Sequence, residues 1–296
     1  MKELQRNFIP GSKWIYIKLY TGSHTADKIL VKDIMFIISK LKKAKLINKW
    51  YFIRYSDPDF HIRLRILANN DFDFASIVNI AFTKLEKLTQ SGLIWKVQFD
   101  TYNRELERYG KILIEESETI FYYDSECILS IIKDIINCNN ENYRWMISLK
   151  LIDIFLSDLK LNIDEKYIIL NELCDSFKRE FNIDNYNKKI LSNKFREHRC
   201  VLESILDNSI EDENFKKLYL HIKKKTSKTS PVLYKLKSDL QNKMHNIALN
   251  DLIKSHIHMT LNRLFSSNNR LYEMVIYDFI NKFYKSKIVR NKNKFI

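Results

Sequence analysis

Glycine and proline are scarce in this chain, which has four glycines and three prolines among its 296 residues. Typical proteins contain about 7% glycine and 5% proline, so collagen-like and turn-dense all-β folds lose support. The sequence also has no GxSxG, Walker A or GxGxxG pattern. Serine hydrolases, P-loop nucleotidases and dinucleotide-binding enzymes therefore lack their signatures here, and we expect a helix-rich fold.

Long apolar runs are missing as well. The longest has five residues, at 34–38, whereas a membrane-spanning helix needs about 20. The first seven residues contain no apolar stretch of signal-peptide length. The cysteines at 127, 138, 174 and 200 show neither CxxC nor zinc-finger spacing. We therefore expect a cytoplasmic protein with reduced thiols, no membrane span and no metal.

Acidic residues are outnumbered: 50 lysines and arginines against 36 aspartates and glutamates give a formal net charge of +14. Such a surface attracts polyanions or acidic substrates. Two of the basic clusters, at 223–228 and 282–294, have the composition of solvated loops or tails. The charge alone leaves both a solvated basic surface and an RNA-binding surface open.

The order of the predicted elements defines the fold class. Apolar and β-branched residues predict strands at 14–20, 50–55, 61–67 and 93–102, and three-to-four-residue spacing predicts helices at 26–44 and 71–88. The same spacing then predicts helices at 116–137, 141–160, 164–180, 189–207, 213–225, 232–248, 250–264 and 269–285. We expect an α+β fold with a small, mainly antiparallel sheet in the N-terminal third and a helix-rich remainder. The prediction is one domain over 1–296, with an α/β part at 1–115 and a helical part at 116–296.

The strand at 61–67 carries an unusual set of cations. Because side chains alternate along a strand, His61, Arg63 and Arg65 share one face, and the isoleucines and leucine between them share the other. A solvated polar face would explain one arginine pair. Because Arg54 is on the neighbouring strand, an anion-binding site is a serious alternative to a solvated polar face. Guanidinium groups match the geometry of carboxylate and phosphate.

Two further clusters lie outside the hairpin. If residues 101–110 are helical, Arg104 and Arg108 fall on one face, with Glu105 beside Arg108. Surface ion pairs are the simpler explanation of that cluster. In the helix at 250–264, His258 and Asn262 are one turn apart, and neighbouring His256 points elsewhere. No HExxH or Cys/His quartet accompanies them, so zinc is not expected.

Together, four stretches resemble one protein family. They are the strand at 14–20, F-I-R-Y-x-D-P-x-x-H-I-R-L-R at 52–65, T-Y-x-R-E-x-x-R-Y-G at 101–110, and H-M-x-x-N-R-L at 258–264. The pattern E-x-x-F-x-x-D-S at 118–125 is also similar. The family is the C-terminal domain of lantibiotic dehydratases, which also occurs as free-standing thiopeptide-type bacteriocin biosynthesis proteins. The resemblance spans roughly residues 12–285.

The resemblance implies an activity: removal of glutamate from glutamylated Ser or Thr of a precursor peptide, which leaves dehydroalanine or dehydrobutyrine. It implies catalytic roles for Arg63, Arg65, Glu105, Arg108 and His258, and we assign substrate binding to Arg54, His61, Arg104, Asn262 and Arg263. β-Elimination needs a base for the Cα proton and cations for the enolate and the departing carboxylate. Histidine suits the first task and permanently charged arginine the second. No cofactor is expected.

Two alternatives stay open. A pyridine synthase of a thiopeptide pathway resembles a repurposed copy of the same domain, although its members tend to lose the arginine and histidine set that this chain keeps. A non-catalytic module that binds leader peptide or tRNA would use the basic surface instead. For elimination, the expected partners are a precursor peptide and a separate glutamylation protein that uses glutamyl-tRNA; direct tRNA binding by this chain is not expected. The sequence leaves a homodimer open.

Overall fold

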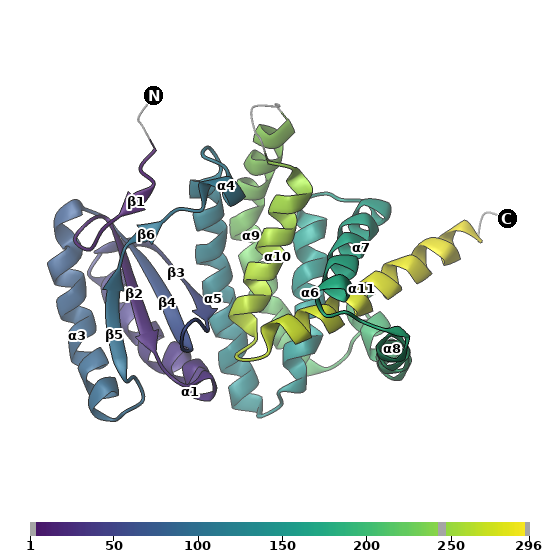
Figure 1. The fold of residues 1–296 in the computed structure, drawn as a ribbon, viewed down its shortest axis with the longest axis horizontal. Helices are drawn as coiled ribbons and strands as arrows, with labels where there is room; N and C mark the ends of the chain where they lie inside the picture. Colours follow the sequence, from purple (N-terminus) through teal and green to yellow (C-terminus); the bar gives the residue numbers. More distant parts are fainter. Residues whose placement is uncertain (1–3, 242–246, 294–296) are drawn as a thin grey trace.

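A computed structural model describes residues 4–241 and 247–293 of the chain. The sheet part lies on one side of the molecule and the helical part on the other, with α5 between them (Figure 1). The main sheet has four antiparallel strands in the order β3-β4-β2-β5. Their bounds are Trp14–Tyr20 for β2, Ile47–Tyr55 for β3, His61–Ala68 for β4 and Lys96–Asp100 for β5. A separate ribbon pairs β1 (Asn7–Phe8) with β6 (Tyr102–Asn103).

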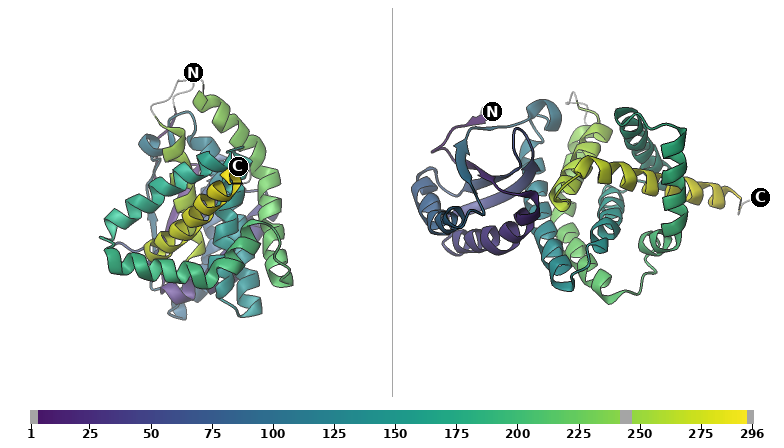
Figure 2. Two further views of the ribbon diagram at one scale, coloured as in Figure 1. Left: turned by 90° about the vertical axis from the view of Figure 1, so that its right-hand side faces the viewer. Right: turned by 60° about the horizontal axis from the view of Figure 1, so that its bottom comes forward.

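The sheet and its helices follow a β-α-β-β-α-β order, in which both helical connections cover one face of the sheet (Figure 2). The first connection comprises α1 (Ser23–Lys28), a π-helical segment (Ile29–Ile34) and α2 (Met35–Lys43). The second comprises a 3-10 turn (Asp71–Asp73) and α3 (Phe74–Gln90). The covered face is mostly apolar and buried, with Arg54 as an exception, and His61, Arg63 and Arg65 lie on the opposite face.

The helical part follows the ribbon. Its elements are α4 (Leu106–Tyr109), α5 (Ile114–Cys138), α6 (Asn142–Asp158), α7 (Ile163–Glu180), α8 (Asn185–Leu206), α9 (Glu213–Gln241), α10 (Leu249–Leu264) and α11 (Asn269–Lys292). The α+β prediction is confirmed. In the described residues, no helix has the length and apolar character that crossing a membrane requires.

Three sequence predictions need correction. The separate helices expected at 213–225 and 232–248 are one helix, α9, which continues through Pro231 to Gln241; residues 242–246 lie outside the described part. Buried leucines and isoleucine on both sides of the proline hold the helix together despite the lost hydrogen bond. The strand expected at 93–102 is divided into β5 and β6, and the helix at 26–44 contains a π-helical segment.

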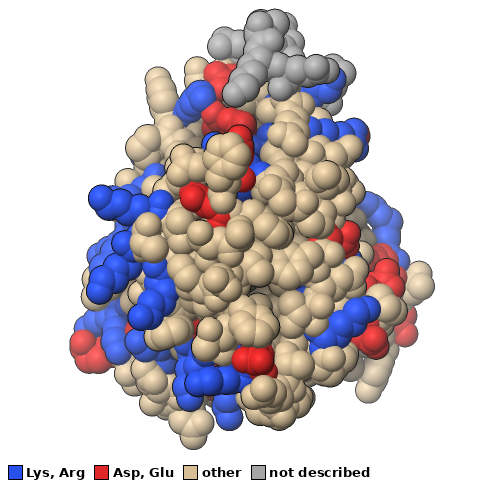
Figure 3. All heavy atoms as spheres, turned by 90° about the vertical axis from the view of Figure 1, so that its left-hand side faces the viewer, with Lys and Arg blue, Asp and Glu red and all other residues tan. Residues whose placement is uncertain are grey.

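Charge is unevenly distributed over the sheet part. On the side that faces away from the helical part, lysines and arginines gather along one flank, beside a broad area with few charged side chains (Figure 3).

Candidate active site

The face of the sheet that α1 to α3 leave uncovered carries the cations of β4. Register pairs Arg65 with Tyr16 and Tyr51, and Arg63 with Lys18 and Ile53. The structure thus brings Arg63 and Arg65 to one face, as the alternation predicts. Beside them, His61 accepts a hydrogen bond from Arg63 Nε at Nε2, 3.1 Å away, and its Nδ1 donates to the Asp59 carbonyl. Burial lowers the pKa of His61, so this neutral imidazole positions Arg63.

Arg65 lies in a cage of tyrosines. Its guanidinium centre is 4.8 Å from the ring of Tyr16, 5.4 Å from Tyr51 and 4.7 Å from Tyr102. Among the described residues no carboxylate forms an ion pair with it, although the side chain is only 8% exposed. Aromatic faces stabilise the cation but accept no strong hydrogen bond. Arg65 therefore keeps its hydrogen-bonding capacity for a ligand.

The hydroxyls of the cage are tied to a buried ion pair behind it. Tyr51 donates to Tyr102 at 2.8 Å, and Tyr102 donates to Glu118 at 2.8 Å. The Glu118 carboxylate also receives two bonds of 2.7 Å from Arg104. Arg104 is thus 5% exposed and engaged with Glu118, which orients the cage.

Arg104 and Arg108 do not share a helical face, contrary to the prediction. Helix α4 begins only at Leu106 and is four residues long, so Arg104 precedes it and points to α5. Arg108 extends from α4 toward α10, where its Nε donates to Ser255 at 3.0 Å. Glu105 lies 3.5 Å from Arg108 Nη1, in agreement with the predicted pairing of these two residues.

A small cavity joins the sheet to α10. Its volume is about 20 Å³. Arg65, Glu105 and Arg263 all line it, together with Ile53 of β3 and Met259 of α10. The sequence-predicted residues from three distant stretches therefore meet at one place.

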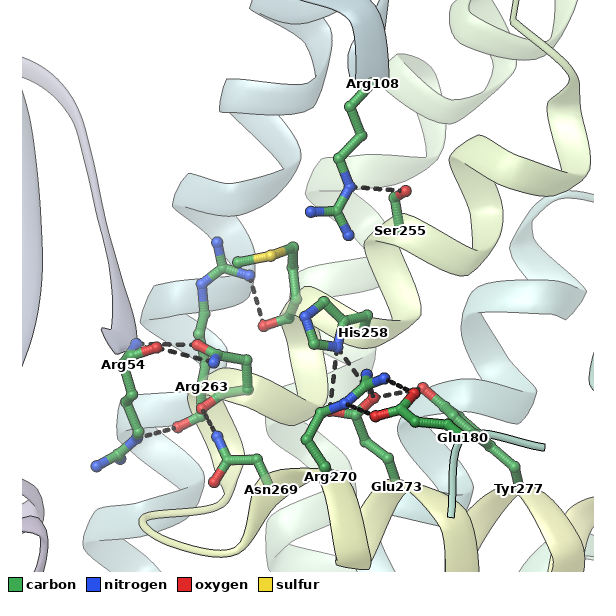
Figure 4. A network of polar contacts seen from close by, with 12 residues as sticks. Arg54, Arg108, Glu180, Ser255, His258, Arg263, Asn269, Arg270, Glu273 and Tyr277 are labelled. Carbon is green, nitrogen blue, oxygen red and sulfur yellow. Dashed lines mark hydrogen bonds and ion pairs between the residues drawn. The ribbon is translucent and has the colours of Figure 1, made fainter. Parts of the chain in front are cut away.

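His258 of α10 is held by a carboxylate that sequence reasoning missed. Its Nδ1 donates to both oxygens of Glu273 in α11, at 3.0 and 2.9 Å (Figure 4). Glu273 is fully buried, and it also receives bonds from Tyr277 and Arg270. Because a carboxylate can only accept, Nδ1 carries a proton, and in the neutral imidazole Nε2 is the nitrogen that has the lone pair. In Figure 4 the Arg108 guanidinium lies on the side of His258 opposite Glu273.

A signal for Glu273 does exist in the sequence. It is an acidic residue within the apolar stretch 271–277, and buried carboxylates almost always have a partner. The partner could not be deduced, because His258 lies on another helix, across the turn between α10 and α11.

Three of the predicted substrate-binding residues serve the packing of the sheet against the helices. Arg54 pairs across the sheet with Ile62, so it points to the opposite face, where Nη2 contacts Asp27 at 2.5 Å. The structure therefore does not place Arg54 with Arg63 and Arg65. Asn262 bridges the backbone N–H and carbonyl of Arg54 along the open edge of β3, both at 2.9 Å. Arg263 Nε donates to the Phe52 carbonyl at 2.8 Å, and Nη1 contacts Asp124 at 3.1 Å.

His256 points away from His258, as predicted. It is buried against Tyr109, Phe121 and Phe155, and burial lowers its pKa to about 3. Within the described ranges no group of three or more His, Cys, Asp or Glu side chains is arranged to hold a metal ion.

The fold and this site define a class of protein. The sequence profile described as "Lantibiotic biosynthesis dehydratase C-term" matches residues 14–284, and the chain belongs to that family. Among curated proteins, the nisin biosynthesis protein NisB of Lactococcus lactis subsp. lactis is 30% identical over 227 residues. That alignment covers 74% of this chain and 21% of NisB, so the chain spans about a fifth of the length of this relative.

Solved structures share the fold. The tRNA-dependent lantibiotic dehydratase MibB from Microbispora sp. 107891 superposes with a TM-score of 0.70 at 17% identity, over 95% of this chain and 29% of MibB. TbtD, a pyridine synthase from thiomuracin biosynthesis, superposes with a TM-score of 0.62 at 10% identity, over 92% of this chain and 99% of TbtD. At these identities the likeness concerns the fold alone.

Proposed function

We propose that this chain acts in the dehydration of a ribosomally made precursor peptide, as a lyase that eliminates glutamate from glutamylated Ser and Thr. The products are dehydroalanine and dehydrobutyrine. Family membership supports a role in peptide dehydration of the lanthipeptide type. The arrangement around His258 supports the elimination step in particular.

The reaction has a simple balance. A base removes the Cα proton, the electron pair forms the Cα=Cβ bond through an enolate, and the Cβ–O bond breaks. The oxygen leaves as part of the glutamate carboxylate. One proton and one carboxylate are released, so no oxidant or reductant is needed. The site must therefore supply a base and stabilise two developing negative charges.

The pairing of His258 with Glu273 is the observation that carries the proposal. The buried carboxylate fixes Nδ1 as the protonated nitrogen and stabilises the imidazolium that forms when Nε2 takes a proton. Arg108 extends toward α10 on the side of His258 away from Glu273, and Arg65 lines a cavity that is also lined by Met259, the residue that follows His258. We assign the Cα proton to His258, and the enolate and carboxylate oxygens to the two arginines. Glu105 orients Arg108, and His61 orients Arg63.

The proposed partners follow from this chemistry. The substrate is a glutamylated precursor peptide, which a separate protein using glutamyl-tRNA must supply. For the elimination step, this chain itself needs only the glutamylated peptide. We therefore assign its basic surface no role in selecting tRNA.

A synthetic peptide with a chemically glutamylated serine tests the proposal. Incubation with the wild-type chain alone, without tRNA, ATP or added metal, should release free glutamate and lower the peptide mass by the mass of glutamic acid. A peptide with two dehydroalanines serves as the comparison substrate. Ring formation from that peptide, with the glutamyl peptide left intact, would replace the proposal with a pyridine synthase. Tight peptide or tRNA binding without conversion of either peptide would favour a binding module.

A further inference from the structure

Two arginines each leave one buried N–H group without an acceptor beside the same cavity. Arg65 Nε and Arg263 Nη2 are buried, and neither has a hydrogen-bond partner among the described residues. The side chains are 8% and 0% exposed. Both line the cavity of about 20 Å³ between the sheet and α10. Because buried N–H groups in native proteins are nearly always paired, these two donors indicate a ligand.

Among the described residues, no group that lines the cavity bonds Arg65 Nε or Arg263 Nη2. The hydroxyls of Tyr51 and Tyr102 are engaged in the chain that ends at Glu118. Burial raises the pKa of Tyr51 to about 12 and also raises that of Tyr109, so both phenols stay neutral. The Met259 carbonyl is already bonded to Arg263 Nη1.

The charge of the cavity lining is unbalanced. Arg263 has a buried partner in Asp124, whereas Arg65 has none among the described residues. Glu105 also lines the cavity, but its side chain is 58% exposed and pairs with Arg108. A water molecule would satisfy the two N–H groups but bring no negative charge into contact with Arg65, whereas an anion does both.

The volume limits the size of the occupant. A cavity of about 10–15 Å³ holds one water molecule, so this one has room for a single small ion or for one atom that projects from a larger group. We propose that the Arg65–Arg263 cavity binds one anionic atom, either a halide ion or an anionic oxygen that a carboxylate or enolate projects into it. Assigning that oxygen to the reacting peptide rests on the proposed function; the halide site does not.

Bromide tests the site without any substrate. Thermal unfolding of the wild-type chain is compared in sodium bromide and sodium gluconate at equal ionic strength, since gluconate is too large for the cavity. The melting temperature should rise with bromide and then saturate. Arg65→Gln should abolish the rise. Lys96→Gln removes the same charge from the same sheet face, where Lys96 lies 5.0 Å from the Tyr20 ring, and should retain it. Anomalous scattering from wild-type crystals in bromide should give a peak between Arg65 and Arg263.

Each alternative outcome has a definite meaning. An equal rise in Arg65→Gln, or bromide at surface positions only, would overturn the site. If a substrate oxygen occupies the cavity, added L-glutamate should compete with bromide. The bromide concentration that gives half of the rise in melting temperature should then increase. Bromide binding without such competition would overturn the substrate assignment. A chain that binds bromide but releases no glutamate would refute the proposed function alone.

Discussion

Nδ1 of His258 lies 2.9 Å from Oε2 of Glu273, and this carboxylate has no exposed surface. A buried carboxylate at this distance orients the imidazole and favours its protonated form during proton transfer. The pair joins α10 to α11, so the geometry of the proposed base depends on the packing of two helices.

Replacing Glu273 by glutamine should impair proton transfer more than folding. The amide N–H can donate a hydrogen bond to Nδ1, which favours the tautomer protonated at Nε2, and a neutral amide does not stabilise an imidazolium. We expect kcat for glutamate release to fall by about 100-fold or more with little change in KM.

Glu180→Gln is the matched control for that variant. Glu180 is the exposed partner of Arg270, and Arg270 also contacts Glu273. The substitution therefore removes a neighbouring ion pair and leaves the contact between His258 and Glu273 in place. Release at the wild-type rate is expected. Equal losses in both variants would indicate that Glu273 acts only through the stability of α11.

Glutamate release should depend on the geometry of the Arg65 N–H donors and not on its positive charge alone. Arg65→Ala should leave the fold intact and reduce glutamate release by about 100- to 1,000-fold. Arg65→Lys should restore little, because an ammonium group cannot match the bidentate geometry. The measurement is single-turnover release with a glutamylated peptide. Full activity in Arg65→Ala would remove Arg65 from the mechanism.

Stability below neutral pH should report on His256. Its pKa is lowered to about 3 in the folded chain, against about 6.5 when unfolded. As the pH falls below 6.5, the unfolded chain binds a proton that the folded chain excludes, so the folded state loses stability. From pH 7 to pH 5 this group should cost about 2 kcal/mol.

Urea unfolding of wild type and His256→Gln at both pH values checks this expectation. The variant should lose less stability than the wild type over the same interval. An equal loss would show that His256 is protonated in the folded chain.

Association with tRNA should be weak. Many basic side chains of the described surface are already paired with acidic ones, and the remaining field is sequence-independent. A gel shift at physiological salt should show a faint complex that fades as salt increases. A tRNA-selective complex that survives about 200 mM salt would contradict the proposed division of labour and favour a binding module.

The fold class and part of the site could be predicted because they rest on local patterns. The alternation in β4 places Arg63 and Arg65 on one face whatever the rest of the chain does. The direction of Arg54 could not be deduced without the hairpin register that pairs it with Ile62. The tyrosine cage depends on β6, a two-residue strand that was hidden in a longer predicted one.

The sequence also could not predict how α10 is oriented against the sheet. Asn262 and Arg263, for which substrate binding stays a prediction, both bond the open edge of β3, a role that the sequence did not indicate. A strand edge offers the same hydrogen-bonding groups as a peptide ligand, and only the structure shows which of them these residues bind.

Glutamate release by wild type, His258→Ala and His256→Gln tests the central claim most directly. All three are given the same glutamylated peptide in equal amounts of folded protein, with melting temperature and peptide affinity measured in parallel. Wild type and His256→Gln should release glutamate, whereas His258→Ala should bind the peptide, keep its melting temperature and leave the peptide glutamylated. Turnover by folded His258→Ala at the wild-type rate would contradict the account.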